Sequence, residues 1–368
     1  MTLDRLRLFT AFDEIPEGCA PAQILFPFTG TQVAHDGFDC WVRDGADLVE
    51  LVGASDAHVA ALPFSGEALL DPPGSRLDDV RRRARSFVSK ASEHGLKTLV
   101  MVHADTDDPV PLPQDDILVL RHSMRGSRRR SNEWSLPAWH EDLLARYCGG
   151  SVALLPWTDR PQVGFCGLAA STAMPITRRA KLALRRALRP LGIDIPHNDG
   201  TWLRQAAMHV CSSAPGLATS FIVRGGYYGG PPRAEETRRA REREEYVENH
   251  VRCGYALCVR GWGNFSFRFF EALSLGRVPV LIDTDCVLPL EDELDYDEFV
   301  VRVPDDALAT LPVRVEAFHR ALDDRSFSAL QSRIRAVWLR HLSPLGFYRA
   351  VVHRLLASKG RSLARATV

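Results

Sequence analysis

Two arginines and one glutamate surround a glycine-rich turn late in the chain. Arg260 precedes Gly261 and Gly263, while Arg268 and Glu271 follow three residues apart on one face of an expected helix. Guanidinium groups bind phosphates, and a carboxylate accepts hydrogen bonds from sugar hydroxyls. The plain alternative is a helical ion pair, although Arg before Glu is the poorer order for such a pair. We therefore favour a nucleoside diphosphate bound at this turn.

The elements around the turn can be predicted from local signals. Tyr255–Val259 is an apolar run of strand length, and Ser266 can cap a helix that continues through Leu275. Gly276 suits the left-handed position that ends a helix, and Pro279–Ile282 begins a second strand. Unpaired N–H groups and the positive end of the dipole make a helix N-terminus a phosphate site.

A further arginine, Arg224, follows another expected strand and precedes two glycines. This places it at a strand's carboxyl end, where α/β sheets bind ligands. The donor-binding candidates are therefore Arg224, Arg260, Gly261, Gly263, Asn264, Ser266, Arg268 and Glu271.

The same turn is close to a dinucleotide-binding fingerprint, which is the main rival interpretation. Asp283 stands about 20 residues after the turn, as that fingerprint requires, and would make the protein a nicotinamide-dependent oxidoreductase. Against this, Ser266 replaces the third glycine, the motif lies late in the chain, and the fingerprint needs neither Arg268 nor Glu271.

Several ordered motifs resemble those of the exostosin glycosyltransferases. They are CVRG at 258–261, NFSFRFFEAL at 264–273, GRVPVLID at 276–283, LPL at 288–290, YVEN at 246–249, VGFCG at 163–167, RSNEW at 130–134 and LPAW at 136–139. The resemblance covers roughly residues 115–300 and implies an α/β fold of the GT-B type, with two Rossmann-like domains facing a cleft. It also implies inverting transfer of a sugar from a nucleotide-sugar, with UDP as first choice, to a glycan or other hydroxyl acceptor.

The length of 368 residues suits two domains, and strands that alternate with helices favour parallel sheets. We expect an acceptor-side domain at 1–158, a donor-binding domain at 159–330 and a helical tail at 331–368 that crosses back onto the first domain. Residues 1–20 are expected to be a loose lead-in. Expected strands lie at 24–28, 97–102, 117–120, 152–155, 163–166, 219–223 and 299–303, and expected helices at 77–94, 137–147, 177–191, 234–249 and 326–356.

The composition limits the partners and the compartment. Lys and Arg balance Asp and Glu at 46 each, so the chain has no global basic field for nucleic acid. We see no signal peptide and no apolar run of membrane-span length, and none of the eight cysteines forms a CxxC pair. We expect free thiols and a cytoplasmic protein of a microbe or virus, unlike the membrane-anchored Golgi exostosins, and leave peripheral membrane contact open.

An inverting transfer also needs a general base, which should come from the first domain. Glu133 ranks first because it lies in the family-like segment, on an expected loop at a strand's carboxyl end. His122 is next and His103 third, since both follow expected strands. Neighbouring arginines at 125 and 128–130 are either a solvated loop or an anion-binding lining.

Two DxD sequences, at 105–107 and 283–285, raise the question of a metal. Paired carboxylates with phosphate oxygens suit Mg²⁺ or Mn²⁺, but acidic residues are also common at strand ends. Because arginines already offer positive charge to the phosphates, we expect no required metal or other cofactor. A catalytically inactive, glycosyltransferase-like binding subunit remains a second alternative.

Overall fold

The computed structural model describes residues 5–30, 36–70, 77–139, 141–170, 200–224 and 236–366, with isolated helical positions between 176 and 188. Contacts divide the chain into two compact units. Unit 1 comprises Met1–Glu141, Cys286–Glu293 and Val337–Val368, and unit 2 comprises Asp142–Asp285 and Leu294–Ala336. The division falls after Glu141, whereas the sequence places a boundary at residue 158. The expected helix at 177–191 lies almost wholly outside the described residues.

Unit 1 is built on a six-stranded parallel sheet in the order β2-β1-β3-β4-β5-β6. The strands are β1 (Leu6–Phe9), β2 (Val49–Leu51), β3 (Val59–Ala61), β4 (Thr98–Val102), β5 (Ile117–Arg121) and β6 (Glu133–Ser135). Its helices include α1 (Phe26–Thr29), α2 (Asp39–Asp44), α3 (Leu77–Glu93) and α11 (Pro344–Ala366), the last preceded by a π-helical turn at Trp338–Leu342.

Apolar spacing explains how the helices of unit 1 pack on its sheet. The α3 residues Val80, Ala84, Phe87, Val88 and Ala91 recur at helical intervals and share one core cluster with the sheet. Tyr348 of α11 packs on Trp41 of α2 with ring centroids 4.5 Å apart. The C-terminal helix thus packs within unit 1, where the sequence places the tail.

The first 30 residues differ from the sequence prediction. The expectation of a loose lead-in at residues 1–20 is wrong for the described part, 5–20, because β1 lies between β2 and β3, with Leu6 and Leu8 fully buried. The strand expected at 24–28 is wrong, since Gln23–Leu25 and Phe26–Thr29 form short helical turns. Pro27 near the start of α1 favours helical φ and lacks the N–H that a sheet ladder requires.

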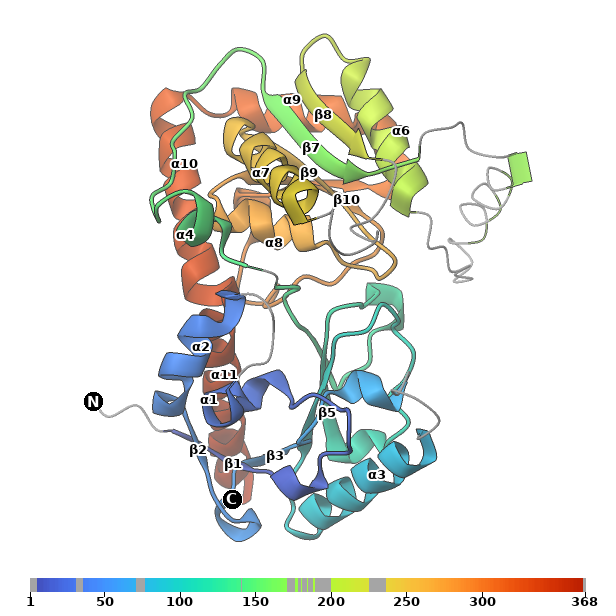
Figure 1. Ribbon diagram of the computed structural model, residues 1–368, viewed down its shortest axis with the longest axis vertical. Coiled ribbons are helices and arrows are strands. Elements are labelled where there is room, and N and C mark those ends of the chain that lie inside the picture. The colour runs from blue at the N-terminus through green and yellow to red at the C-terminus, as the bar shows by residue number, and fades with distance from the viewer. Residues whose placement is uncertain are drawn as a thin grey trace. The chain divides into compact units, whose positions relative to one another are not determined.

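Unit 2 has its own five-stranded parallel sheet in the order β11-β10-β9-β7-β8 (Figure 1). The strands are β7 (Gln162–Leu168), β8 (Ala218–Arg224), β9 (Tyr255–Val259), β10 (Val278–Asp283) and β11 (Val301–Pro304). The helices are α4 (Leu143–Tyr147), α6 (Gly200–Ser212), α7 (Glu236–Arg252), α8 (Phe267–Ser274), α9 (Leu311–Arg320) and α10 (Asp324–Val337).

The strand order of unit 2 contains a topological switch point. If the strands of unit 2 are numbered 1 to 5 along the chain, their order in the sheet is 2-1-3-4-5. The connection after β7 leads to the neighbour on one side of β7, and the connection after β8 leads to β9 on the other side. The strand order therefore reverses between β7 and β9. Open α/β sheets bind ligands outside the carboxyl ends of the strands at such a point. The two separate parallel sheets with flanking helices confirm the expected pair of Rossmann-like α/β domains.

Two smaller expectations for unit 2 are wrong. The helix expected from 137 begins only at Leu143, because the Asp142 side chain caps it by accepting from the Leu144 and Ala145 N–H groups. The strand expected at 152–155 does not form. There, the Leu155 N–H donates to Oε1 of Gln331, and the Leu155 carbonyl accepts from Nε2 of Gln331, each at 2.9 Å. These two hydrogen bonds take the place of those to a neighbouring strand.

Gln331 also belongs to a buried polar hub around Arg277, which is 1% exposed. The guanidinium donates to Gln331 Oε1 and to the carbonyls of Ala153, Val251 and His250 at 2.7–3.2 Å. Burial lowers the pKa of Arg277 to about 10. Because Arg277 precedes β10, this hub lies at the amino ends of the strands, away from the switch-point edge.

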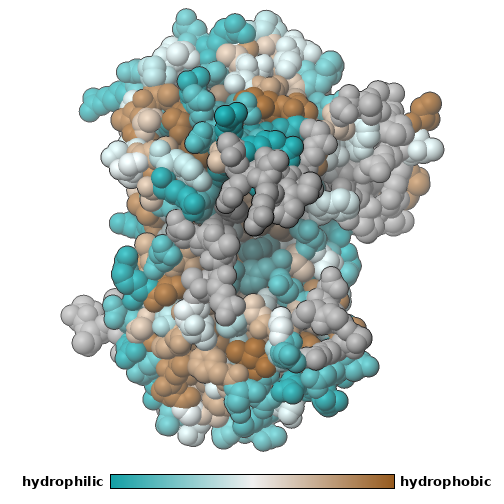
Figure 2. Space-filling model, in the orientation of Figure 1, coloured by the Kyte–Doolittle hydropathy of each residue, from teal (hydrophilic) through white to brown (hydrophobic). Residues whose placement is uncertain are grey.

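The described surface gives no sign of a membrane span. None of the described helices combines the length and the apolarity needed to cross a bilayer. On the face drawn in Figure 2, hydrophilic side chains are mixed with apolar ones.

Candidate nucleotide site and the arginines of the two units

The glycine-rich turn lies at the switch-point edge of unit 2. It directly follows β9 and is closed by a hydrogen bond of 3.2 Å from the Gly261 N–H to the Phe265 carbonyl. Ser266 occupies the N-cap position of α8 with extended backbone, but its hydroxyl makes no capping hydrogen bond. The first N–H groups of α8 are therefore not satisfied by the side chain that usually caps them, as an anion site requires.

Three buried arginines lie at this edge, and each donates to at least one main-chain carbonyl. Arg268 donates to the Cys166 carbonyl at 2.7 Å, and Arg260 to the Trp262 carbonyl at 2.6 Å. Arg204 of α6 donates to the carbonyls of Leu168 and Arg260, both at 2.9 Å. The three residues are 7–8% exposed. Carbonyl oxygens carry no net charge, so these hydrogen bonds orient the guanidinium groups.

Two glycines allow the close approach of these groups. Gly167 has a φ of +149°, and a Cβ there would lie 2.8 Å from Nη2 of Arg268. A Cβ on Gly200, the first residue of α6, would lie 2.4 Å from the Arg260 carbonyl oxygen. The sequence analysis missed Gly200 and Arg204. The available signal was an arginine on the apolar face of α6, where Ala207, Met208 and Cys211 are buried.

Asn264 connects the turn to the end of β10. Its side-chain oxygen accepts a hydrogen bond of 2.5 Å from the Thr284 hydroxyl, and its amide donates to the Asp285 carbonyl at 3.2 Å. Asn264 is 3% exposed. These contacts fix the backbone of the turn relative to the neighbouring strand.

Glu271 is held by residues of α7 and not by Arg268. Its carboxylate accepts from Nη2 of Arg243 at 3.0 Å and from the Tyr246 hydroxyl. Burial and the neighbouring carboxylate raise the pKa of Tyr246 well above its usual value. The ion pair between Arg268 and Glu271 considered from the sequence is therefore not formed. Binding of a ribose hydroxyl by Glu271 stays a prediction.

Arg224 ends β8, at the predicted carboxyl end of a strand. Its Nη2 donates to the Glu245 carboxylate and to the Glu242 carbonyl, each at 2.7 Å. The Arg224 guanidinium group is therefore paired with residues of α7. Arg224 thus differs from the three arginines of the turn in having carboxylate partners, and its role in donor binding stays a prediction.

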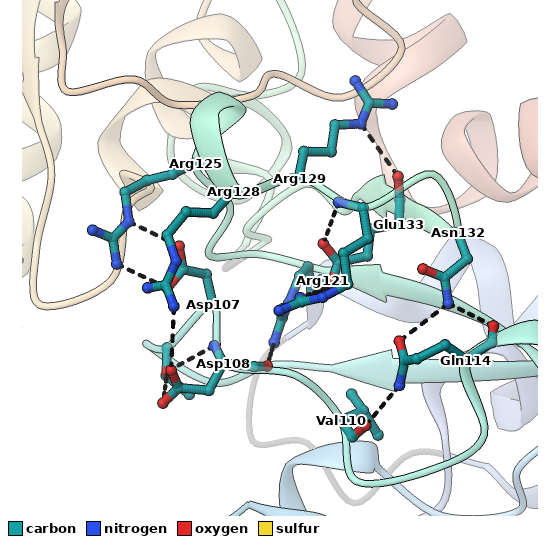
Figure 3. Close-up of polar contacts among 12 residues, drawn as sticks. Asp107, Asp108, Val110, Gln114, Arg121, Arg125, Arg128, Arg129, Asn132 and Glu133 are labelled. Atoms are coloured by element: carbon teal, nitrogen blue, oxygen red, sulfur yellow. Dashed lines mark hydrogen bonds and ion pairs between the residues drawn. The ribbon is translucent and has the colours of Figure 1, made fainter. Parts of the chain in front are cut away.

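The arginines of unit 1 have a different kind of partner (Figure 3). Arg125 holds Asp107 with two hydrogen bonds of 2.8 Å, and Arg128 binds the same carboxylate at 3.0 Å. Arg129 pairs with Glu291 at 2.9 Å. Burial raises the pKa of Asp107, but the hydrogen bond from Arg125 and the charges of Arg125 and Arg128 outweigh it and lower that pKa. This arginine run forms internal ion pairs, which disfavours the anion-binding alternative.

Glu133 is also part of this network. The expected loop position is wrong, because Glu133 is the first residue of β6 and is 3% exposed. Its carboxylate accepts from Nη1 of Arg121 and Nη1 of Arg130, both at 2.9 Å, and from the Arg130 N–H at 3.1 Å. Burial lowers the pKa of Arg121, which is fully buried. A carboxylate held this way is poorly placed to take a proton from a substrate.

His103 and His122 lie at the carboxyl ends of β4 and β5, as the sequence predicts. Their ring centroids are 4.8 Å apart at 71°, and Nδ1 of His103 lies 3.3 Å from the Ser65 hydroxyl oxygen. Burial lowers the pKa of His103 to about 4. Burial, with a smaller contribution from the neighbouring His103, lowers the pKa of His122 well below its usual value. Both rings are therefore neutral at neutral pH.

The residues of the two DxD sequences do not fit a metal site. The Asp107 carboxylate forms ion pairs with Arg125 and Arg128, and Oδ2 of Asp283 lies 3.8 Å from Nε of Arg302. Asp285 adopts a φ of +68°, which turns the chain after β10. Among the described residues, no three His, Cys, Asp or Glu side chains are grouped to hold a metal ion.

Comparison with known proteins links the turn to one family. Residues 228–318 match the Exostosin GT47 domain. A probable glucuronosyltransferase of Oryza sativa subsp. japonica is 32% identical over 103 residues, which are 25% of this chain and 25% of that protein. Exostosin-1 of Drosophila melanogaster is 24% identical over 186 residues, 50% of this chain and 23% of that protein. A probable β-1,4-xylosyltransferase of Arabidopsis thaliana is 35% identical over 77 residues, 19% of each chain.

The matches span about a quarter or less of the length of these curated relatives. Likenesses to solved structures are weak. S. aureus TarM in complex with fondaparinux, α-GlcNAc-glycerol and UDP has a TM-score of 0.34 and 10% identity, with coverage of 80% of this chain and 54% of that chain. Sucrose-phosphate synthase from Thermosynechococcus elongatus has a TM-score of 0.34 and 14% identity, with coverage of 99% and 100%. The fold assignment therefore rests on the two parallel sheets themselves.

Proposed function

We propose that this protein is an inverting glycosyltransferase, because residues 228–318 match the Exostosin GT47 domain. It transfers a sugar from a nucleoside-diphosphate sugar, with UDP as the first choice of nucleotide, to a hydroxyl group of a glycan. The observation that carries this proposal is the set of three buried arginines at the switch point, bound to carbonyls beside the uncapped start of α8.

The arrangement suits a leaving group that gains negative charge. In an inverting transfer a base takes the acceptor's hydroxyl proton, and the acceptor oxygen bonds to the anomeric carbon. The bond from that carbon to the diphosphate oxygen breaks, and its electron pair leaves with the diphosphate. Arg260 and Arg268, with the N–H groups of α8, stabilise this charge because they are oriented before the reaction begins. Arg204 fixes the Arg260 carbonyl and so positions the turn.

The names of the relatives suggest which donors to test first. They describe a probable glucuronosyltransferase and a probable xylosyltransferase. UDP-glucuronic acid and UDP-xylose are therefore the first candidates, with UDP-sugars of neutral hexoses as the next set. The cytoplasmic location expected from the sequence and any contact with a membrane surface stay predictions.

The oxidoreductase alternative loses support in the structure. A dinucleotide fingerprint belongs to the first strand–helix turn of its sheet, whereas this turn follows β9, the third strand of unit 2. Asp283, which would bind the ribose, lies beside Arg302. The arginines inside the site also have no role in that fingerprint.

A turnover assay tests the proposed function and separates it from an inactive binding subunit. The purified protein is mixed with each UDP-sugar and a panel of oligosaccharide acceptors, and released UDP and glycosylated product are measured. We expect UDP release that depends on the acceptor for one donor, and a product of inverted anomeric configuration by NMR. Binding of UDP without turnover of any donor would favour the inactive subunit, and tight binding of NADH would favour the oxidoreductase.

A further inference from the structure

One tryptophan is exposed, and it lies in the glycine-rich turn. All seven tryptophans of the chain are among the described residues, and Trp262 is 62% exposed while the others are buried or half-buried. Its neighbours Arg260, Gly263 and Asn264 are buried. Scattered apolar side chains are common on protein surfaces. Tryptophan, however, is highly buried on average, so its exposure at the edge where ligands bind requires an explanation.

The backbone that carries Trp262 is held by groups of the candidate diphosphate site. Nη2 of Arg260 donates to the Trp262 carbonyl at 2.6 Å, and the Gly261 N–H closes the turn on the Phe265 carbonyl at 3.2 Å. Asn264 connects the other side of the turn to the end of β10. The indole is therefore attached to a fixed backbone, beside an arginine that we assign to a phosphate.

A second exposed aromatic ring lies on the same segment. Phe267, the first residue of α8, is 43% exposed, and its ring contacts that of Phe265 edge to face, with centroids 5.4 Å apart at 81°. The face of an aromatic ring attracts partial positive charge, and the indole of Trp does so most strongly. The C–H groups of a pyranose carry such charge because each carbon also bears an oxygen. An exposed indole therefore suits a sugar ring.

The order of groups in a nucleoside-diphosphate sugar indicates which part meets Trp262. Glu271, the expected ribose partner, is the fifth residue of α8 and contacts α7 through Arg243 and Tyr246. The turn precedes the start of α8, where the diphosphate is expected. A donor with its diphosphate at this point has its nucleoside on the Glu271 side and its sugar on the side of the turn.

We propose that Trp262 binds the transferred sugar of the donor by stacking its indole on the C–H face of the pyranose ring. This inference rests on the proposed function. The turn and α8 both belong to unit 2, so the contact needs no residue of unit 1. Because UDP lacks the pyranose, the contact exists with the donor and is lost after transfer. Trp262 therefore selects the nucleotide-sugar over the free nucleotide product.

Calorimetry with and without the sugar tests this assignment. UDP and the UDP-sugars of xylose and glucuronic acid are titrated, without acceptor, into the wild type, Trp262→Ala, Trp262→Phe and the control Leu154→Ala. Leu154 is also an exposed apolar residue of unit 2, at 51%. It follows Ala153, whose carbonyl binds Arg277 at the amino ends of the strands. The control thus removes exposed apolar surface away from the turn.

The expected effect depends on the presence of the sugar. Removing an aromatic ring that stacks on a nucleobase weakens binding by about 5- to 150-fold. A pyranose has no π-face, so Trp262→Ala should fall at the lower end, with about 5- to 10-fold weaker binding of the UDP-sugar. Affinity for UDP should stay within twofold of the wild type. Trp262→Phe should lose less than Trp262→Ala, and Leu154→Ala should bind both ligands normally.

Quenching of tryptophan fluorescence by acrylamide gives a second measurement, on the wild type. Because Trp262 is the exposed tryptophan, the difference between the wild type and Trp262→Phe reports on this ring. The UDP-sugar should protect the ring from the quencher more than UDP does. Equal protection by the two ligands would contradict the stacking of the sugar.

The other outcomes separate this inference from the proposed function. If the wild type binds neither UDP nor any UDP-sugar, the proposed function fails and the inference fails with it. If the wild type binds a UDP-sugar and folded Trp262→Ala binds it equally well, only the inference is overturned. An equal loss for UDP and the UDP-sugar would place the base on the indole and overturn the assignment to the sugar. Should Trp262→Ala not fold by circular dichroism, the quenching measurement decides.

Discussion

The two units use arginine in opposite ways. In unit 1, Arg121, Arg125, Arg128, Arg129 and Arg130 each bind a carboxylate. In unit 2, Arg204, Arg260 and Arg268 donate to main-chain carbonyls at the switch-point edge. The five arginines of unit 1 share the carboxylates of Asp107, Glu133 and Glu291, whereas the hydrogen bonds named for the three arginines of unit 2 go to uncharged oxygens. The partner of an arginine, more than its burial, therefore separates a structural role from a binding role.

Arg277 shows that the partner alone is not sufficient. It also binds carbonyls, but it lies where β10 begins, and its three nitrogens donate four hydrogen bonds to main-chain and side-chain oxygens. The arginines of the turn lie instead where β7 and β9 end. The arginines assigned to ligand binding therefore share two features: they donate to main-chain carbonyls, and they lie at the carboxyl ends of the strands.

The largest expected effect comes from breaking the ion pairs between arginines and carboxylates in unit 1. Glu133→Gln removes the charge that compensates the fully buried Arg121 and should destabilise the protein by about 3–5 kcal/mol. The midpoint of urea unfolding, followed by circular dichroism, measures this loss. UDP affinity in the folded variant should stay unchanged. A stable Glu133→Gln protein with a selective loss of kcat would instead restore Glu133 as the base.

Arg277→Met tests the carbonyl-bound arginine that lies away from the switch-point edge. Each buried carbonyl left without a donor should cost about 1–3 kcal/mol, and the thermal midpoint should fall accordingly. Because the hub lies at the amino ends of the strands, UDP affinity should be maintained in the folded variant. A specific loss of UDP binding in a protein of normal stability would contradict the division by sheet edge.

A smaller effect is expected in acid for the ion pairs of unit 1. The pKa of Asp107 is lower in the folded than in the unfolded chain, so its pairing stabilises the protein above the ordinary pKa of 3.8. This stabilisation is lost as the pH falls below 3.8 and through the folded pKa. Urea midpoints measured from pH 5 to pH 2 should therefore fall less steeply for Asp107→Asn than for the wild type. Equal slopes would show that the pair contributes nothing.

The smallest expected effect is that of metal removal. Since arginines and the start of α8 offer positive charge to the leaving group, turnover should be unchanged in excess EDTA. Activity that is abolished by EDTA and restored by Mn²⁺ would contradict this. The carboxylates at Asp105, Asp283 and Asp285 would then have to be considered as ligands.

The sequence predicted the site best where the signals are local. The strand Tyr255–Val259, the helix start after Ser266 and the left-handed Gly276, with a φ of +71°, are confirmed, although the Ser266 side chain makes no capping hydrogen bond. Arg204 could not be placed, because its partners Leu168 and Arg260 are 36 and 56 residues away along the chain. Such contacts follow from strand order, which local periodicity does not determine.

Errors of the sequence prediction have the same physical origin. The strand at Leu6–Phe9 is only four residues long, too short for periodicity to identify, yet it lies inside the sheet. The motif around Glu133 was identified from its family-like segment, but its expected loop position is wrong, and its ion-pair partners were not foreseen. Arg121 stands 12 residues earlier, in the neighbouring strand, and only the pairing of β5 with β6 brings the two side chains together.

The central claim is most directly tested by UDP calorimetry on a matched pair of variants, one from each unit. Arg268→Ala removes a carbonyl-bound guanidinium from the turn, and Arg125→Ala removes a carboxylate-bound one from unit 1. A charge-assisted hydrogen bond contributes roughly 1.5–3 kcal/mol, so Arg268→Ala should weaken UDP binding by about 10- to 150-fold. Arg125→Ala should leave it unchanged. Unaltered UDP affinity in folded Arg268→Ala, or an equal loss in Arg125→Ala, would contradict the account.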